Sequence, residues 1–282
     1  MPSPTEITVP QLARLVGTPD APAIVDVRSE EHFNADPRFV PCALRRDPAS
    51  VDTWADAYRG RHVVVTCQHG GESSQGVAAW LRTQGIEAES LEGGYVAWLA
   101  AGALLVDSRR LPARDAKLRT VWVTRARPKV DRIACPWLIR RFVDPDAVLL
   151  FVSPTEVAGV AERFKAAPYD VDGVHWSHRG DWCSFDTFVN ELGLSSPPLD
   201  RLALIVRGAD TGRLDLTPES AGLLAATLGY SRMYKDDLEQ LAHAMEFYDA
   251  LYRWARDATD ETHNWPASSP KQAPKAPEPT RT

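Results

Sequence analysis

A short apolar run that ends at a cysteine and leads into a glycine-containing loop constrains this chain more than any other feature. Residues 62–66 are strand-like, and residues 77–81 place apolar side chains at helical spacing. The N–H groups of such a loop and of a helix N-terminus can point at one sulfur, which lowers the pKa of a free thiol from about 8.5. The loop consists of Cys67, Gln68, His69, Gly70, Gly71, Glu72 and Ser73. We predict that Cys67 is a reactive thiolate; the alternative is a buried structural cysteine at a strand end.

Two further segments flank this loop. Residues 23–28 form an apolar run that ends in Asp26, Val27 and Arg28, and residues 90–98 contain Leu-Glu-Gly-Gly followed by Trp98. In this order and at this spacing, the three segments resemble the landmarks of a rhodanese domain over about residues 5–105.

The resemblance implies both a fold and an activity. The fold is a small α/β domain with a mainly parallel sheet and helices on both faces. The activity is sulfur transfer through a persulfide on Cys67, from a small-molecule donor to a thiol acceptor such as glutathione. The implied substrate-binding residues are Gln68, His69, Gly70, Gly71, Glu72, Ser73, Asp26 and Arg28.

The loop departs from the rhodanese pattern at positions where many members carry cationic residues. The sixth position is Glu72 and the second is the neutral Gln68. A carboxylate beside the nucleophile repels an anionic donor and raises the pKa of the thiol. We therefore expect a natural donor other than thiosulfate. His69 can supply some positive character, although a single loop histidine is usually an ordinary polar residue.

Composition limits the classes of function. The chain has 282 residues, enough for two domains, and its net charge of −6 argues against a dedicated nucleic-acid binder. No apolar run reaches the ~20 residues of a membrane helix, and the first residues do not resemble a signal peptide. The cysteines are widely spaced and show no pairing pattern: Cys42, Cys67, Cys135 and Cys183. We expect a cytoplasmic protein with free thiols and without membrane or nucleic-acid partners.

The sequence divides into four parts. We predict a rhodanese-like domain over residues 1–105, an exposed charged linker over 106–118, a mostly helical α+β domain over 119–264, and a disordered Pro/Lys-rich tail over 265–282.

The apolar spacing also predicts individual elements. In the first domain we expect helices over residues 10–16 and 48–58 and a last helix starting at Trp98. The second domain has predicted strands at 120–124 and 147–152 and helix starts at Cys135, Ser153 and Thr217, and the longest helix spans 233–256.

Basic residues crowd one stretch of the second domain. Guanidinium groups beside a helix N-terminus at Cys135-Pro136 predict an oxyanion site with a low-pKa cysteine. The candidates are Arg127, Lys129, Arg132, Cys135, Arg140 and Arg141. The alternative is a solvated basic face, with a small buried Cys135 against Trp137.

A second cluster lies at residues 175–186, which contain two histidines, one cysteine and two aspartates. Because imidazole, thiolate and carboxylate are metal ligands, His178, Cys183 and Asp186 are candidates for holding a metal ion. No other cofactor is expected. The alternative is that the histidines are ordinary polar residues, since no standard zinc spacing is present.

The second domain resembles the C-terminal domain of chromate resistance proteins of the ChrB type over about residues 119–256. Residues 125–141, 177–180 with 183–186, and 205–211 carry the resemblance. It implies a role in chromate resistance or in chromate-dependent regulation, with chromate as a candidate ligand.

Two functions follow. The first is a sulfurtransferase that carries sulfane sulfur on Cys67 to a thiol acceptor and is coupled to chromate resistance. The alternative is a non-catalytic chromate- or metal-binding sensor or regulator, in which Cys67 is modified once rather than cycling.

Overall fold

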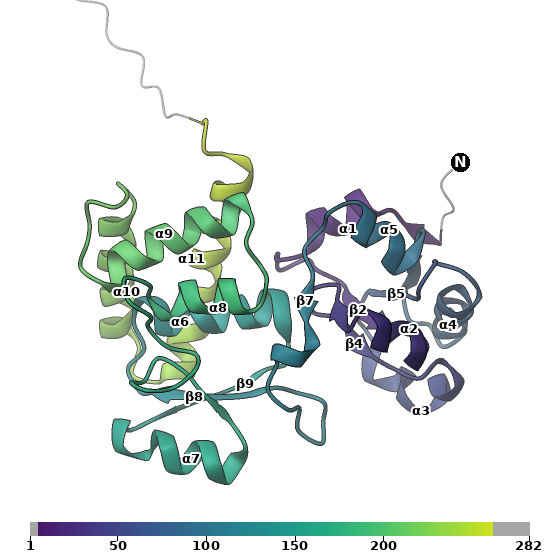
Figure 1. Cartoon of the computed structure of the whole chain (residues 1–282), viewed down its shortest axis with the longest axis horizontal. Coiled ribbons are helices and arrows are strands. Elements are labelled where there is room, and N and C mark those ends of the chain that lie inside the picture. The colour runs from purple at the N-terminus through teal and green to yellow at the C-terminus, as the bar shows by residue number, and fades with distance from the viewer. Residues whose placement is uncertain (1–4, 262–282) are drawn as a thin grey trace, which may run out of the picture.

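A five-stranded parallel sheet forms the centre of the N-terminal half of this computed structural model, which describes residues 5–261 (Figure 1). The strand order is β1-β6-β5-β2-β4. All residues of β2 and β5 are buried, as expected for strands covered on both faces. The strands are β1 (Glu6–Ile7), β2 (Ala23–Asp26), β4 (Leu44–Arg45), β5 (Val63–Thr66) and β6 (Ala88–Leu91).

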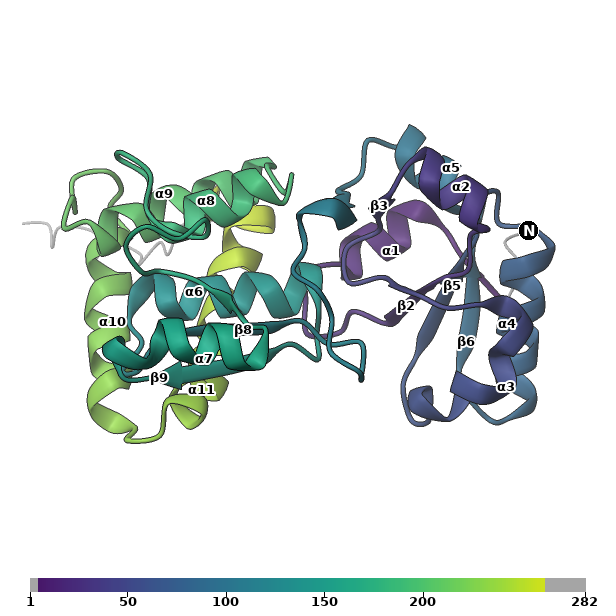
Figure 2. The ribbon, with the colours of Figure 1, turned by 60° about the horizontal axis from the view of Figure 1, so that its bottom comes forward.

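Helices cover both faces of this sheet, which confirms the predicted fold class. Figure 2 shows α1 and α5 on one side of the sheet and α3 and α4 on the other. Ile24 and Val64 belong to the core with α1 and α5, whereas Val25 and Val65 belong to the core with α3 and α4. This split follows from the alternation of side chains along a strand. The helices are α1 (Val9–Leu15), α2 (Glu30–Ala35), α3 (Val51–Trp54), α4 (Glu72–Thr83) and α5 (Gly94–Ala100).

Two predicted elements of this half differ from the structure. The predicted last helix does not start at Trp98; α5 starts at Gly94, because Gly93 and Gly94 both adopt the positive φ that begins it. The predicted helix over 48–58 is a short α-helix flanked by two 3-10 turns, Pro48–Ser50 and Ala55–Tyr58.

The C-terminal half is mostly helical around a three-stranded parallel sheet of order β10-β8-β9, which again agrees with prediction. Alternate residues of β8 pack into two different apolar clusters. Val121 and Val123 pack with α7, and Trp122 packs with the remaining helices. The strands are β8 (Val121–Arg125), β9 (Val148–Val152) and β10 (Ala167–Pro168). The helices are α6 (Val130–Leu138), α7 (Val157–Phe164), α8 (Ser184–Glu191), α9 (Pro197–Asp210), α10 (Ser220–Met233) and α11 (Asp237–Asp257).

Helix starts in this half were predicted less well. Cys135 does not open a helix, because α6 begins at Val130 and holds Cys135 and Pro136 in its interior. The longest helix starts at Asp237, where the side chain of Asp236 accepts a hydrogen bond from the Glu239 amide. Ser153 precedes a 3-10 turn and makes no capping bond, and the predicted helix at Ser153 begins only at Val157.

The segment predicted as an exposed linker is partly built into the fold. β7 (Val106–Asp107) pairs antiparallel with β3 (Arg38–Phe39), and Val106 is buried in the core. After the 3-10 turn Ser108–Arg110, Arg114 forms an ion pair with Asp144 at 3.1 Å. The predicted tail over 265–282 lies outside the described residues. Over residues 5–261, no helix combines the length and apolarity needed to cross a membrane.

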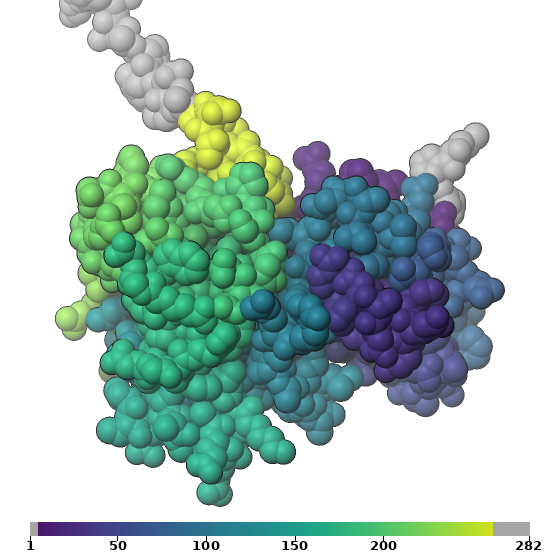
Figure 3. All heavy atoms as spheres, viewed as in Figure 1, coloured from purple at the N-terminus to yellow at the C-terminus, as the bar shows by residue number. Residues whose placement is uncertain are grey.

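The hydrophobic core is continuous between the two halves. The largest cluster of buried apolar residues includes Leu12 and Trp98 from the N-terminal half and Trp137 and Phe142 from the C-terminal half. The amide of Cys42 donates to the carbonyl of Phe142 at 3.0 Å. Figure 3 shows the surfaces of the two halves meeting along their boundary. The halves are therefore packed against each other rather than tethered.

We predict that Gly17→Ala lowers the free energy of unfolding more than Gly60→Ala does. Both glycines have positive φ, 80° and 75°, so either alanine costs about 1–2 kcal/mol of backbone strain. A Cβ at Gly17 would lie 2.3 Å from a ring carbon of Phe142, which adds ~1–3 kcal/mol of overpacking, whereas at Gly60 nothing lies within 4 Å. Urea unfolding of the full chain measures the difference. Equal losses for the two variants would contradict the packing of Phe142 on Gly17.

Candidate active site and metal centre

Cys67 lies where the central strand β5 ends, at the start of the loop that leads into α4. Its side chain is 8% exposed, and Gly71 occupies the position before the first residue of α4. The sulfur therefore lies next to the N-terminus of a twelve-residue helix, where backbone N–H groups lack partners within the helix. This agrees with the arrangement predicted from the sequence.

Hydrogen-bond donors surround the sulfur. Burial raises the pKa of Cys67, but hydrogen bonds from the Ser74 hydroxyl and from the backbone N–H groups of Ser74, His69 and Gly71 lower it further than burial raises it. The Cys67 Sγ and Ser74 Oγ atoms lie 3.1 Å apart. The result is a thiol whose pKa lies below its ordinary value, which increases the thiolate fraction at neutral pH.

The turn at Gly93-Gly94 holds the cysteine loop in shape. The amides of Tyr95 and Val96 donate to the carbonyls of Cys67 and Gln68 at 2.9 and 3.0 Å. A Cβ on Gly94 would lie 2.4 Å from the Cys67 carbonyl oxygen. Gly94 is therefore required for the close backbone contact with the cysteine loop, a role that its place in the sequence landmark did not reveal.

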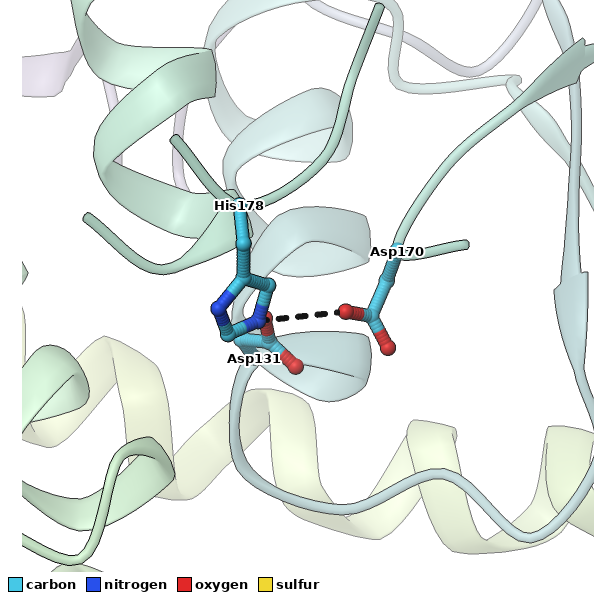
Figure 4. A group of neighbouring side chains, drawn as sticks. All are labelled: Asp131, Asp170 and His178. Carbon is cyan, nitrogen blue, oxygen red and sulfur yellow. Dashed lines mark ion pairs between the residues drawn. The ribbon is translucent and has the colours of Figure 1, made fainter. Parts of the chain in front are cut away.

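A second group of reactive side chains lies in the C-terminal half. His178 Nε2 lies 3.4 Å from Asp131 Oδ2, 3.4 Å from Asp170 Oδ1 and 3.2 Å from Asp210 Oδ2. Figure 4 shows His178 and Asp170 pointing toward each other, with Asp131 beside them. The side chains of Asp131 and Asp170 are 3% and 5% exposed, whereas that of His178 is 43% exposed. The group is thus a buried acidic site whose histidine faces solvent.

The charges in this group perturb one another strongly. Burial raises the pKa of Asp131 to about 7, opposed by its hydrogen bond to His178. Hydrogen bonds to Asp131, Asp170 and Asp210 raise the pKa of His178 to about 12. Asp131, Asp170 and His178 bring one donor atom each within 4.8 Å of the others, close enough to hold one metal ion.

Comparisons with known proteins agree with both halves. Residues 8–101 match the model of the Rhodanese-like domain family, and residues 122–255 match that of the ChrB C-terminal domain. The chain joins a rhodanese-like domain to a ChrB C-terminal domain. Protein ChrB of Cupriavidus metallidurans is 33% identical over 132 residues, which are 46% of this chain and 39% of that protein. The match therefore spans well under half of its curated relative.

Solved structures resemble the rhodanese-like domain. A rhodanese-related protein from Thermoplasma volcanium is 20% identical and covers 36% of this chain and 96% of its own, with a TM-score of 0.32. A rhodanese-like domain protein from Staphylococcus aureus is 25% identical and covers 33% of this chain and 90% of its own, with a TM-score of 0.31.

Two residues expected at the substrate site belong to the scaffold of the rhodanese-like domain instead. Asp26 and Arg28 form a buried ion pair at 2.7 Å. The Arg28 guanidinium also donates to the carbonyls of Asp36 and Arg38, and it lies 3.8 Å from the Tyr95 ring centroid. Because these contacts occupy the guanidinium, the prediction that it binds substrate is wrong.

The other loop residues lie around the sulfur in different environments. His69 and Glu72 are exposed, and Gln68 and Ser73 are half-buried. Gly70 is buried with positive φ, and a Cβ there would lie 2.7 Å from the Leu91 carbonyl oxygen. The net pKa of Cys67 is lowered, and Glu72 is not among the groups that chiefly determine it.

The predicted oxyanion site in the ChrB domain does not form one pocket. Arg127 binds carbonyls at the end of α10, Arg141 pairs with Asp249, and Arg132 pairs with Asp170. Cys135 is fully buried, and burial raises its pKa well above the ordinary value, the reverse of the prediction. Lys129 is exposed before α6 and Arg140 is half-buried. These residues make separate contacts around α6 and its neighbouring helices, so their proximity in sequence did not indicate a shared anion site.

Of the three predicted metal ligands, only His178 lies in the acidic group. Cys183 and Asp186 form the capping box of α8: the Cys183 thiol donates to Asp186 Oδ2 at 3.2 Å. Asp186 is also held by Arg207 at 2.6 Å, and burial raises the pKa of Cys183, which keeps its thiol neutral. Both groups are therefore already engaged.

A usable signal was nevertheless present in the sequence. Each of the three stretches that carry the ChrB resemblance contributes one residue to the acidic group: Asp131, His178 and Asp210. Asp170 lies between the stretches, directly after β10 and Tyr169, so only the fold brings it to the site.

We predict that Ser74→Ala raises the pKa of Cys67. Losing a hydrogen bond to a charged group, worth ~1.5 kcal/mol, corresponds to about tenfold less thiolate below the pKa. The measurement is the rate of Cys67 alkylation by iodoacetamide against pH, followed by peptide mass spectrometry. The control is Ser73→Ala, whose hydroxyl makes no hydrogen bond to Cys67 among the residues that the structure describes. An unchanged profile for Ser74→Ala would show that its hydroxyl does not stabilise the thiolate.

Proposed function

We propose that this chain is a sulfurtransferase in which Cys67 carries sulfane sulfur as a persulfide and delivers it to a thiol acceptor. The observation that carries the proposal is the lowered pKa of Cys67 inside a ring of hydrogen-bond donors. A thiolate is the nucleophile in exchange at sulfur, and the same donors can stabilise a persulfide anion in its place. The match to the Rhodanese-like domain family supports this reading.

The proposed cycle has two displacements at sulfur. The Cys67 thiolate attacks the outer sulfur of a donor, the donor's S–S bond breaks, and its electron pair leaves with the rest of the donor as a thiolate or sulfite. Cys67 is left as a persulfide anion. An acceptor thiolate, such as that of glutathione, then attacks the terminal sulfur, and the Cys67 thiolate departs. No net oxidant is needed, because sulfane sulfur moves from one thiol to another.

We further propose that this chemistry serves chromate resistance in the cytoplasm. The match to the ChrB C-terminal domain supports the link, and all four cysteines are free thiols, as a reducing compartment favours. Thiols and persulfides are reductants and chromate is an oxidising dianion. A protein that replenishes persulfide groups on a small thiol would therefore supply reductant for chromate.

We predict that wild type, but not Cys67→Ser, gains one sulfur atom after incubation with glutathione persulfide. The reason is that Cys67 alone combines a lowered pKa with a donor-lined loop. Intact mass spectrometry detects the adduct, which added thiol should discharge over repeated cycles. Cys42→Ser is the matched control and should keep the adduct, because burial raises the pKa of Cys42. Absence of any adduct, or a single modification without turnover, would contradict catalysis and favour the sensor function.

We predict that Glu72→Arg raises the rate with thiosulfate by about tenfold at low ionic strength, because the change turns a repulsive charge into an attractive one. The rate of sulfite release measures this. Glu87→Arg makes the same change of charge just before β6. Glu87 lies at the amino-terminal end of the parallel strands, whereas Cys67 lies at their carboxyl-terminal end, so this variant should have no effect. A rate for Glu72→Arg at or below the wild-type value would contradict electrostatic exclusion of thiosulfate.

A further inference from the structure

We infer that the ChrB domain holds one divalent transition-metal ion between Asp131, Asp170 and His178, with the Asp210 carboxylate beside the same imidazole as a further donor. The site lies apart from Cys67 in the chain and does not depend on the sulfurtransferase activity proposed above. Its donors come from the first turn of α6, the residues after β10, the loop before α8 and the end of α9.

The spacing of the donor atoms is the first argument. His178 Nε2 carries at most one proton, yet three carboxylate oxygens lie 3.2 to 3.4 Å from it. Charge-assisted hydrogen bonds to an imidazolium are shorter, about 2.7–2.9 Å. Donors about 2.0–2.2 Å from a shared metal ion would instead lie about 2.8–3.6 Å from one another in tetrahedral or octahedral geometry. The three distances from His178 fit the edges of a coordination polyhedron better than they fit hydrogen bonds, and the ligand atoms of Asp131, Asp170 and His178 all lie within 4.8 Å of one another.

The charge around the site is the second argument. Three carboxylates converge on a single imidazole, and two of them are almost fully buried. Arg125 and Arg132 both bind Asp170 Oδ2, which leaves Oδ1 directed toward His178. Among the described residues, Asp131 and Asp210 have only the shared imidazole of His178 as a cationic partner. Buried carboxylates without enough cationic partners are destabilising, and a divalent ion supplies positive charge at the point where they meet.

A supporting layer of hydrogen bonds orients the carboxylates. The Ser184 amide donates to Asp131 Oδ2 at 3.2 Å, and the Ser184 hydroxyl donates to Asp170 Oδ1 at 2.9 Å. These contacts, with the two arginines on Asp170, are the type of outer layer that fixes ligands around a metal ion. By contrast, His175 lies nearby on the same loop but contacts Glu191, at 3.5 Å, and the Arg179 guanidinium.

The donor set indicates which ions fit. Three carboxylate oxygens and one imidazole nitrogen suit Mn²⁺, Fe²⁺ or Zn²⁺, whereas a thiolate would be needed to favour copper(I). The nearby thiols of Cys135 and Cys183 are neutral and buried. Because the His178 side is exposed, a water molecule or an anion can reach a free coordination position on a bound ion.

The test uses the full chain, stripped with chelator and then dialysed separately against Mn²⁺, Zn²⁺ and, without oxygen, Fe²⁺. We expect wild type to retain one equivalent of at least one ion by elemental analysis, and to melt at a higher temperature when loaded. His178→Ala and the near-isosteric Asp210→Asn should each lose at least tenfold in affinity by titration calorimetry. Cys67→Ser should bind like wild type, which separates this site from the sulfur chemistry.

The control is His175→Ala, which removes an imidazole from the same loop without touching the four carboxylate and imidazole donors. It should retain one equivalent. Wild type that retains none of the three ions would overturn the inference, and so would equal retention by wild type and Asp210→Asn. Circular dichroism and melting of the metal-free proteins establish that each variant is folded, so loss of binding cannot be attributed to unfolding.

Discussion

The close backbone contact between the Gly93-Gly94 turn and the cysteine loop is the interaction on which the candidate active site depends. The loop has to present N–H groups to the sulfur, so its carbonyls must point the other way and find partners. The first amides of α5 provide them for Cys67 and Gln68. A side chain on Gly94 would separate the two segments. The thiolate environment is thus built jointly by the starts of two helices, α4 around the sulfur and α5 behind the loop.

Two opposing effects set the reactivity of Cys67, and their balance explains why this cysteine differs from the others. Burial disfavours a thiolate at all four cysteines. At Cys67, hydrogen bonds from Ser74 and the loop amides exceed that penalty, whereas Cys42, Cys135 and Cys183 lack comparable donors and have raised pKa values. A helix start by itself is not sufficient: Cys183 precedes α8, yet its neighbour Asp186 places a carboxylate against the thiol.

Local patterns predicted the N-terminal half better than the C-terminal half for a physical reason. The strand, cysteine and helix that form the loop are consecutive, so their spacing in sequence is also their arrangement in space. The acidic site instead depends on Asp131, Asp170 and His178 meeting across β-strand and helix packing, which no local pattern encodes. The basic stretch was misleading for the same reason: Arg132 in α6 and Arg141 in the turn that follows it point in different directions, toward Asp170 and Asp249. Cys183 and Asp186 were predicted as metal ligands from their side-chain chemistry and their proximity to His178, but their three-residue spacing is that of a helix cap.

Helix α6 connects the acidic site with the boundary between the two halves. Asp131 lies in its first turn, and the chain continues past Pro136 into a π-helical turn, Ile139–Val143. Phe142, in that turn, contacts Gly17 of the rhodanese-like domain, roughly 16 Å of helical rise from Asp131. Proline lacks an N–H group for the helix ladder, and wider turns are common where the ladder is interrupted. The aromatic side chains around Phe142 belong to the core shared by both halves, so the domain interface fixes the C-terminal end of this segment. The contacts of Asp131 fix the N-terminal end of α6. The two domains therefore share a structural element as well as a core.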